Sequence, residues 1–127
     1  MAVVRVFVSF EFERDSGLKD SFIEQAGQYD SLFTIKDTSL KGPYHEAVWV
    51  GAAQKAIDRS DAVIVLVGPD THNAPGVLQE VKMAKRLNKP IFQIRPQGKA
   101  YGGVRGAGEI HSWRWKPIRS FLGNLTN

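Results

Sequence analysis

The chain has 127 residues, a length that suits one domain, with 43% hydrophobic and 24% charged residues as in globular proteins. It holds no cysteine, which excludes disulfides, thiolate metal sites and cysteine nucleophiles, and its three histidines lack metal-ligand spacing. The net charge of +4 is divided unevenly, because residues 1–81 carry 7 Lys and Arg against 12 Asp and Glu, and residues 82–127 carry 10 against one. The basic C-terminal third could attract a polyanion or could form a solvated rim.

No segment approaches the ~20 consecutive apolar residues that span a bilayer, and no charged region precedes the apolar start of the chain. We therefore expect a single cytoplasmic domain over residues 1–127.

The first third of the chain predicts a strand, a helix and a second strand. Apolar and β-branched residues fill 3–10 (VVRVFVSF), which indicates a central strand covered on both faces. Apolar residues at helical spacing predict a helix from Asp15 or Ser16 to Gly27. The alternating residues 32–36 (LFTIK) predict a short strand.

The remaining chain repeats this alternation. A loop at 37–45 precedes a helical pattern at 46–61, and AVIVLVG at 62–68 predicts the most buried strand. Pro75 suits the first turn of a helix that runs to about residue 87, and PIFQI at 90–94 predicts a fourth strand.

Five glycines without periodicity predict a loop that includes residues 98–112, before a terminal helix at 116–123. Strands that alternate with helices imply right-handed crossovers. We expect a three-layer α/β fold with a parallel sheet in the order 2-1-3-4, with room for a short fifth strand.

Ligands of such sheets bind beyond the carboxyl ends of the strands, near the switch in strand order. That edge would gather residues 9–14, 37–45 and 68–76. No glycine-rich phosphate loop follows the first strand, and no G-x-S-x-G nucleophile elbow is present.

Glu80 lies close enough to this edge to belong to it. At 100° per residue it flanks the apolar face of its helix, away from the solvent stripe that holds Lys82 and Arg86. A carboxylate there is partly desolvated, which favours its protonated form or suits it to a cationic or hydroxyl-rich ligand. The spacing alone favours a structural charge that stabilises the helix N-terminus or pairs with a nearby Lys.

Three stretches, in this order, resemble the bacterial TIR-like domains that include the TIR proteins of the Thoeris antiphage system: VVRVFVSFEFERD, SDAVIVLVGPDTH and GVLQEVKMAKRLNKPIFQI. The resemblance implies a flavodoxin-like sheet and cleavage of NAD at the nicotinamide–ribose bond, with Glu80 as the catalytic glutamate. The product would be a cyclic or linear ADP-ribose signal that diffuses to a separate effector. NAD would be the substrate, and no cofactor is expected.

The resemblance also implies residues that bind NAD: Ser9, Phe10, Arg14, His72 and Asn73. Four of them have a structural alternative, namely core packing for the Phe10 ring, an ion pair for Arg14, and turn capping for His72 and Asn73. In the family a tryptophan often stands where this chain has Gly76.

The stretch SLKGPYH corresponds to the family's BB loop, which often contacts a neighbouring protomer and completes the NAD site. Lys41, Tyr44 and His45 are the candidates for that role, so we expect self-association through this loop. The alternative function is a non-catalytic TIR-like assembly module that uses the same loop and the terminal helix.

Nucleic-acid binding by the basic C-terminal third is disfavoured because no recognised nucleic-acid module is present, and no membrane partner is expected.

Overall fold

A computed structural model describes residues 3–11, 14–29, 33–39 and 46–125. Five parallel strands form one sheet in the order β2-β1-β3-β4-β5, which confirms the predicted order and the short fifth strand. The strands are β1 (Val4–Ser9), β2 (Phe33–Thr38), β3 (Ala62–Leu66), β4 (Ile91–Arg95) and β5 (Ile110–Ser112).

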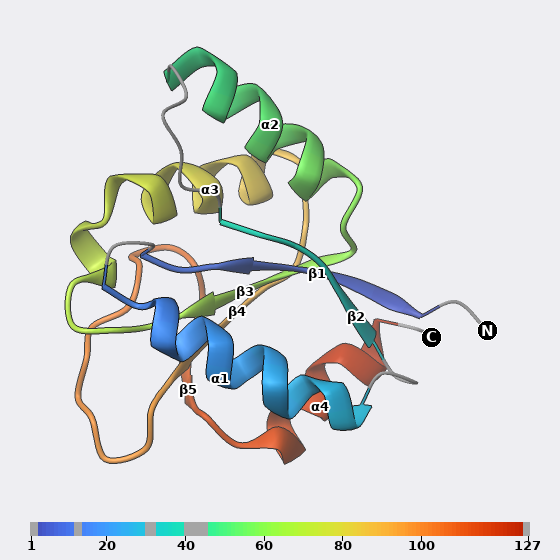
Figure 1. The fold of residues 1–127 in the computed structure, drawn as a ribbon, viewed down its shortest axis with the longest axis vertical. Coiled ribbons are helices and arrows are strands. Elements are labelled where there is room, and N and C mark those ends of the chain that lie inside the picture. The colour runs from blue at the N-terminus through green and yellow to red at the C-terminus, as the bar shows by residue number, and fades with distance from the viewer. Residues whose placement is uncertain (1–2, 12–13, 30–32, 40–45, 126–127) are drawn as a thin grey trace.

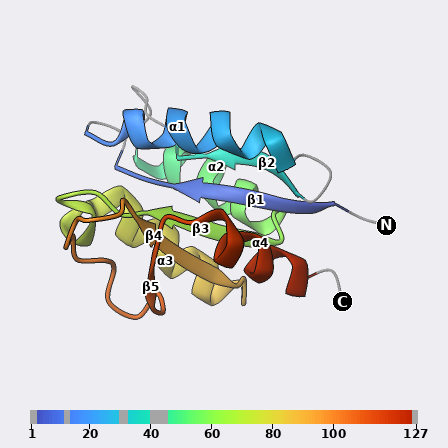
Figure 2. The same cartoon turned by 90° about the horizontal axis from the view of Figure 1, so that it is seen from below.

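The helices cover both faces of this sheet, so the domain has three layers. They are α1 (Ser16–Ala26), α2 (Glu46–Asp58), α3 (Pro75–Arg86) and α4 (Trp115–Asn124), with short 3-10 turns at Gly27–Tyr29 and Thr71–Asn73. Figure 1 shows α2 and α3 on one face and α1 and α4 on the other. Figure 2, seen from below, shows α1 and α4 in front of the sheet and α2 and α3 behind it. Among the helices described, none is both long and apolar enough to cross a bilayer.

Each face of the sheet has its own hydrophobic core, because neighbouring residues of a strand point to opposite faces. Alternate residues of β1, namely Val4, Val6 and Val8, pack with Phe22 of α1 and Leu122 of α4 in the α1-side core. Phe7 of β1 packs instead with residues of α2 and α3 in the α3-side core. Burial on both faces explains why β1 and β3 read as continuous apolar runs.

The pairing of β1 with β2 contains a bulge. Val6 pairs with Ile35, whereas the next residue, Phe7, pairs with Asp37, so β2 holds one extra residue at this point. Val8 then pairs with Thr38, and the Ser39 N–H donates to the Val8 carbonyl at 2.9 Å. The bulge therefore brings Ser39 level with Ser9 at the carboxyl end of the sheet.

The glycine-rich segment after β4 differs in part from the sequence prediction. Residues 110–112 form β5, within the stretch expected to be a loop, and pair with β4 from Gln93 to Arg95. The preceding residues are attached to the sheet by the buried Gln93 side chain. Its Oε1 accepts from the Val104 N–H at 2.8 Å, and its Nε2 donates to the Gly108 carbonyl at 2.8 Å.

Candidate functional site

Glu80 lies in the second turn of α3 and faces the sheet. Its exposed fraction is 1%, and it belongs to the buried face of the helix with Val77, Val81 and Ala84. The helical angle predicted a position beside the apolar face. Glu80 lies within that face instead, because two serine hydroxyls from the sheet give its carboxyl hydrogen-bond partners there.

The two hydroxyls bind the same carboxyl oxygen. Ser9, the last residue of β1, donates from Oγ to Glu80 Oε1 at 2.7 Å. Ser39, the first residue after β2, donates to the same atom at 2.5 Å and accepts from the Phe10 N–H at 3.0 Å. Glu80 Oε2 is buried and has no hydrogen-bond partner among the described residues. One oxygen is thus held in place, and the other retains its capacity to accept.

Burial dominates the electrostatics of this carboxyl. It raises the pKa of Glu80 from 4.5 to about 7, while the hydrogen bonds from Ser39 and Ser9 lower it in part. The protonated and ionised forms are therefore both populated near neutral pH. A carboxyl with this pKa can act as a proton donor, a proton acceptor or a stabiliser of positive charge.

The space beside Gly76 is occupied by an aromatic ring from another helix. A Cβ placed at Gly76 would lie 3.6 Å from the indole of Trp49 on α2. An indole therefore lies next to the position that carries tryptophan in many TIR domains, although it comes from a different part of the chain.

The other residues predicted to bind NAD do not surround Glu80 closely. The Phe10 ring is 2% exposed and belongs to the α1-side core, on the opposite face of the sheet. Arg14 is exposed and forms ion pairs with Asp70 and with Glu11. Each of these placements corresponds to the structural alternative considered for that residue.

His72 and Asn73 are exposed in the 3-10 turn that precedes α3, with Asn73 Nδ2 3.2 Å from His72 Nε2. Both are in the chain segment that leads to Glu80. Lys41, Tyr44 and His45 lie outside the described residues.

Sequence reasoning did not single out Ser39. The available signal was its position, since it directly follows a strand predicted to neighbour β1, and the carboxyl ends of neighbouring parallel strands meet at one edge. The bulge that aligns it with Ser9 has no comparable signal in the sequence.

A second buried carboxyl, Asp15, was also missed as a site residue. It is 3% exposed and accepts a hydrogen bond from Thr71 Oγ1 at 3.3 Å. A Cβ at Gly68 would come within 2.3 Å of both of its carboxyl oxygens, so a larger residue there would force the Asp15 carboxyl to move. Burial raises the pKa of Asp15, and the Thr71 hydroxyl opposes this.

Asp15 and its acidic neighbours do not form a metal centre. Over the four ranges that the structure describes, no group of three His, Asp or Glu side chains is placed to hold a metal ion.

The fold and the buried site define the class of this protein. Its parallel sheet in the order β2-β1-β3-β4-β5, covered by helices on both faces, is a doubly wound α/β domain of flavodoxin-like topology. The sequence model of the "Thoeris protein ThsB, TIR-like domain" family matches residues 7–101, about three quarters of the chain. The chain belongs to this family, and the matched region contains Ser9, Ser39 and Glu80.

Among solved structures, the CMP N-glycosidase BcmB of Clostridium botulinum is similar, with a TM-score of 0.55 and 17% sequence identity. The similarity covers 93% of this chain and 97% of that chain. At this identity the two proteins share a fold. A comparison with proteins of curated function found no match.

Proposed function

We propose that this protein cleaves NAD at the bond between nicotinamide and ribose, and forms an ADP-ribose-derived signal, cyclic rather than linear, in antiphage defence. The observation that carries the proposal is the state of Glu80. Its carboxyl is buried, one oxygen is held by two serine hydroxyls, and the second has no partner among the described residues. Membership of the Thoeris TIR-like family supports this substrate, and the similar fold of an N-glycosidase supports the reaction class.

The reaction requires stabilisation of a positive charge. When the C1′–N bond of NAD breaks, the bonding electrons leave with nicotinamide and the ribose becomes oxocarbenium-like. Ionised Glu80 stabilises that charge through Oε2, while Ser9 and Ser39 hold Oε1 and prevent the carboxyl from rotating. Water that adds to C1′ and loses a proton yields linear ADP-ribose. A nucleophile of the same dinucleotide yields a cyclic isomer.

The site of the isolated chain is closed, since Glu80 is 1% exposed. Substrate access therefore requires a rearrangement near the carboxyl. We propose that self-association through the loop of residues 39–45 provides it, with Lys41, Tyr44 and His45 as the contributing side chains.

The test is mass spectrometry of nicotinamide and ADP-ribose isomers after incubation of the purified chain with NAD, with and without lysate of infected cells. Glu80→Gln should lower nicotinamide release by roughly 10²–10³-fold, the effect of losing one electrostatic catalytic group. Glu24→Gln, the same change on the exposed face of α1, is the matched control and should leave release unchanged.

Undiminished release by Glu80→Gln would refute the mechanism. CMP is assayed in parallel, and cleavage of CMP without cleavage of NAD would refute the substrate. No loss of NAD in any condition, from a chain that still self-associates, would favour the non-catalytic assembly module.

A further inference from the structure

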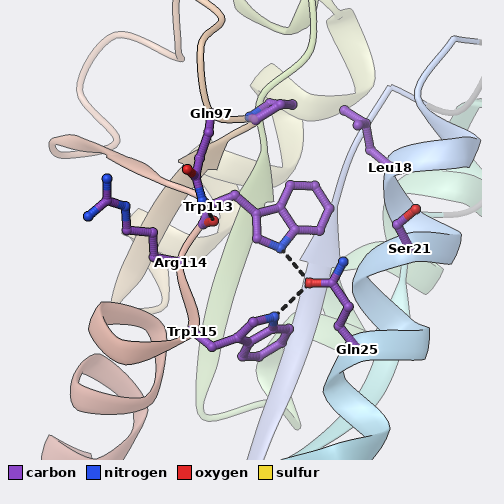
Figure 3. A pocket seen from close by; sticks show the side chains of 8 residues that line it. Leu18, Ser21, Gln25, Gln97, Trp113, Arg114 and Trp115 are labelled. Atoms are coloured by element: carbon purple, nitrogen blue, oxygen red, sulfur yellow. Dashed lines mark hydrogen bonds between the residues drawn. The ribbon is translucent and has the colours of Figure 1, made fainter.

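A cavity of about 550 Å³ lies on the face of the sheet opposite Glu80, between α1 and the chain that follows β4 and β5. Figure 3 shows the side chains that line it. Leu18, Ser21 and Gln25 line it from α1, and their spacing of three and four residues places them on one face of the helix. Gln97 and Trp113 stand on the other side. The proposed NAD chemistry uses none of these residues.

Two indoles make one wall of this cavity. Trp115 stacks on Phe22 with ring centroids 5.2 Å apart, and Trp113 meets the edge of the same ring at 5.9 Å. Both indole N–H groups donate to Gln25 Oε1, at 3.1 Å from Trp113 and 2.6 Å from Trp115. Both indole N–H groups thus have an acceptor that fixes the orientation of the rings, and an aromatic wall of this kind can stack on another flat ring.

The shared hydrogen bonds also determine the orientation of the Gln25 amide. Only the carbonyl oxygen can accept two N–H donors, so the amide nitrogen must take the other position. Figure 3 shows this nitrogen on the side of Ser21. Within the described chain, neither Gln25 Nε2 nor the Ser21 hydroxyl has a hydrogen-bond partner in the structure. Two donor groups thus border the aromatic wall, and the indole hydrogen bonds set the orientation of the one on Gln25.

One of the residues that line the cavity, Arg114, carries a positive charge. Arg114 is exposed at the rim and forms no ion pair with any carboxylate among the residues described.

These features describe a ligand with a flat ring, hydrogen-bond acceptors on the ring edge and an anionic group at one end. An acyl chain would leave the amide and hydroxyl donors unpaired, and a neutral sugar would not use the cation. We propose that this cavity binds a nucleoside monophosphate. The base stacks on Trp113, its ring-edge acceptors receive hydrogen bonds from Gln25 and Ser21, and the phosphate pairs with Arg114.

Calorimetric titration of the full chain with adenosine 5′-monophosphate tests this site. Tryptophan fluorescence provides a second readout, because two of the three tryptophans line the cavity. Adenosine should bind more weakly than the monophosphate because it lacks the anion, and ribose 5-phosphate should bind much more weakly because it lacks the base.

Gln25→Glu is the most specific variant. Its carboxylate can still accept both indole N–H groups, so the wall is kept, but the two N–H donors are replaced by an acceptor. Binding should weaken about tenfold or more, and Trp113→Leu should weaken it to a similar extent by removing the stack. Gln28→Glu, the same change at an exposed position nearby, is the control and should bind like the wild type.

Saturable binding that is lost in Gln25→Glu and kept in Glu80→Gln would support the cavity whether or not NAD is cleaved. The absence of saturable binding or quenching would overturn the proposal. Binding that survives both cavity variants, or that is lost in Glu80→Gln alone, would place the ligand elsewhere and also overturn it. Equal affinity for ribose 5-phosphate and the monophosphate would contradict the role of the base.

Discussion

At Glu80, burial and hydrogen bonding act on the pKa in opposite directions. Burial disfavours the carboxylate, whereas the Ser9 and Ser39 hydroxyls stabilise it, and the outcome is a pKa of about 7. The serines therefore have two effects on this carboxyl. They orient it through one oxygen, and they keep enough of it ionised near neutral pH to stabilise a cation.

The first residue-scale prediction concerns Ser39→Ala. The proposed chemistry uses the carboxylate, so NAD cleavage should rise with pH through about 7. Loss of the Ser39 hydrogen bond raises the pKa of Glu80 further, so the midpoint of the pH–rate profile should move to higher pH. Activity at pH 7 should fall roughly tenfold, in keeping with a lost hydrogen bond to a charged group.

The measurement is kcat/KM for NAD across the pH range. Ser60→Ala is the control, because Ser60 is equally buried but donates to the Ala56 carbonyl, away from Glu80. A lower rate with an unmoved midpoint would show that Ser39 has a structural role only.

A second residue-scale prediction concerns stability. The folded state holds the Glu80 proton up to about pH 7, whereas the unfolded chain releases it near 4.5. The unfolded state binds fewer protons within that window, so the free energy of unfolding falls as the pH rises through it. The loss should total about 3 kcal/mol and be complete above the folded pKa.

Glu80→Gln removes this titration and leaves the other ionisable groups in place. Urea unfolding at a series of pH values should therefore show the variant gaining stability relative to the wild type from pH 4.5 to 7. A constant difference across that range would mean that the carboxyl is not held protonated in the folded state.

At the scale of elements, the bulge in β2 decides which side chain reaches α3. Successive residues of a strand face opposite sides of the sheet, so one extra residue reverses the faces of all that follow. Without the bulge, Thr38 rather than Ser39 would stand level with Ser9. The catalytic arrangement proposed for α3 therefore depends on an irregularity in a neighbouring strand.

The Gln93 amide makes three of the hydrogen bonds that attach the connection from β4 to β5. Gln93→Leu would leave the backbone N–H and carbonyl of Val104 and the carbonyl of Gly108 without their partner. Each backbone group that stays buried without a partner costs about 1–3 kcal/mol. A local rearrangement of residues 98–109 that exposes these groups to water would relieve part of that cost. We expect the free energy of unfolding to fall by roughly 2–4 kcal/mol.

Hydrogen exchange at the Val104 amide is the direct measurement and should become faster in Gln93→Leu. Gln28→Leu, at an exposed position, is the control for the same replacement. Unchanged exchange would mean that other contacts hold residues 98–109 against the sheet.

At the scale of the whole molecule, a closed carboxyl in a single chain predicts that activity depends on assembly. If self-association opens the site, the rate of NAD cleavage should rise more steeply than protein concentration. It should rise on the order of fourfold per doubling while the dimer is the minor species. Tyr44→Ala should lower the rate at low concentration and leave the free energy of unfolding unchanged.

Sedimentation velocity and NAD turnover over the same concentration range test this dependence. Turnover that is proportional to concentration while the chain sediments as a monomer would show that one copy has a complete site. The loop of residues 39–45 would then have no role in assembling it.

The sequence by itself determined the strand order, the approximate extent of the helices and the position of Glu80 away from the solvent stripe of its helix. These features depend on local periodicity and on apolar runs, which a single chain displays directly. The tertiary structure alone decided the partners of Glu80, because Ser9 and Ser39 are 71 and 41 residues away from it in sequence. The tertiary structure also showed that the Phe10 ring lies on the face of the sheet opposite Glu80. Ser9 and Phe10 are adjacent in the extended chain, so their side chains point to different faces.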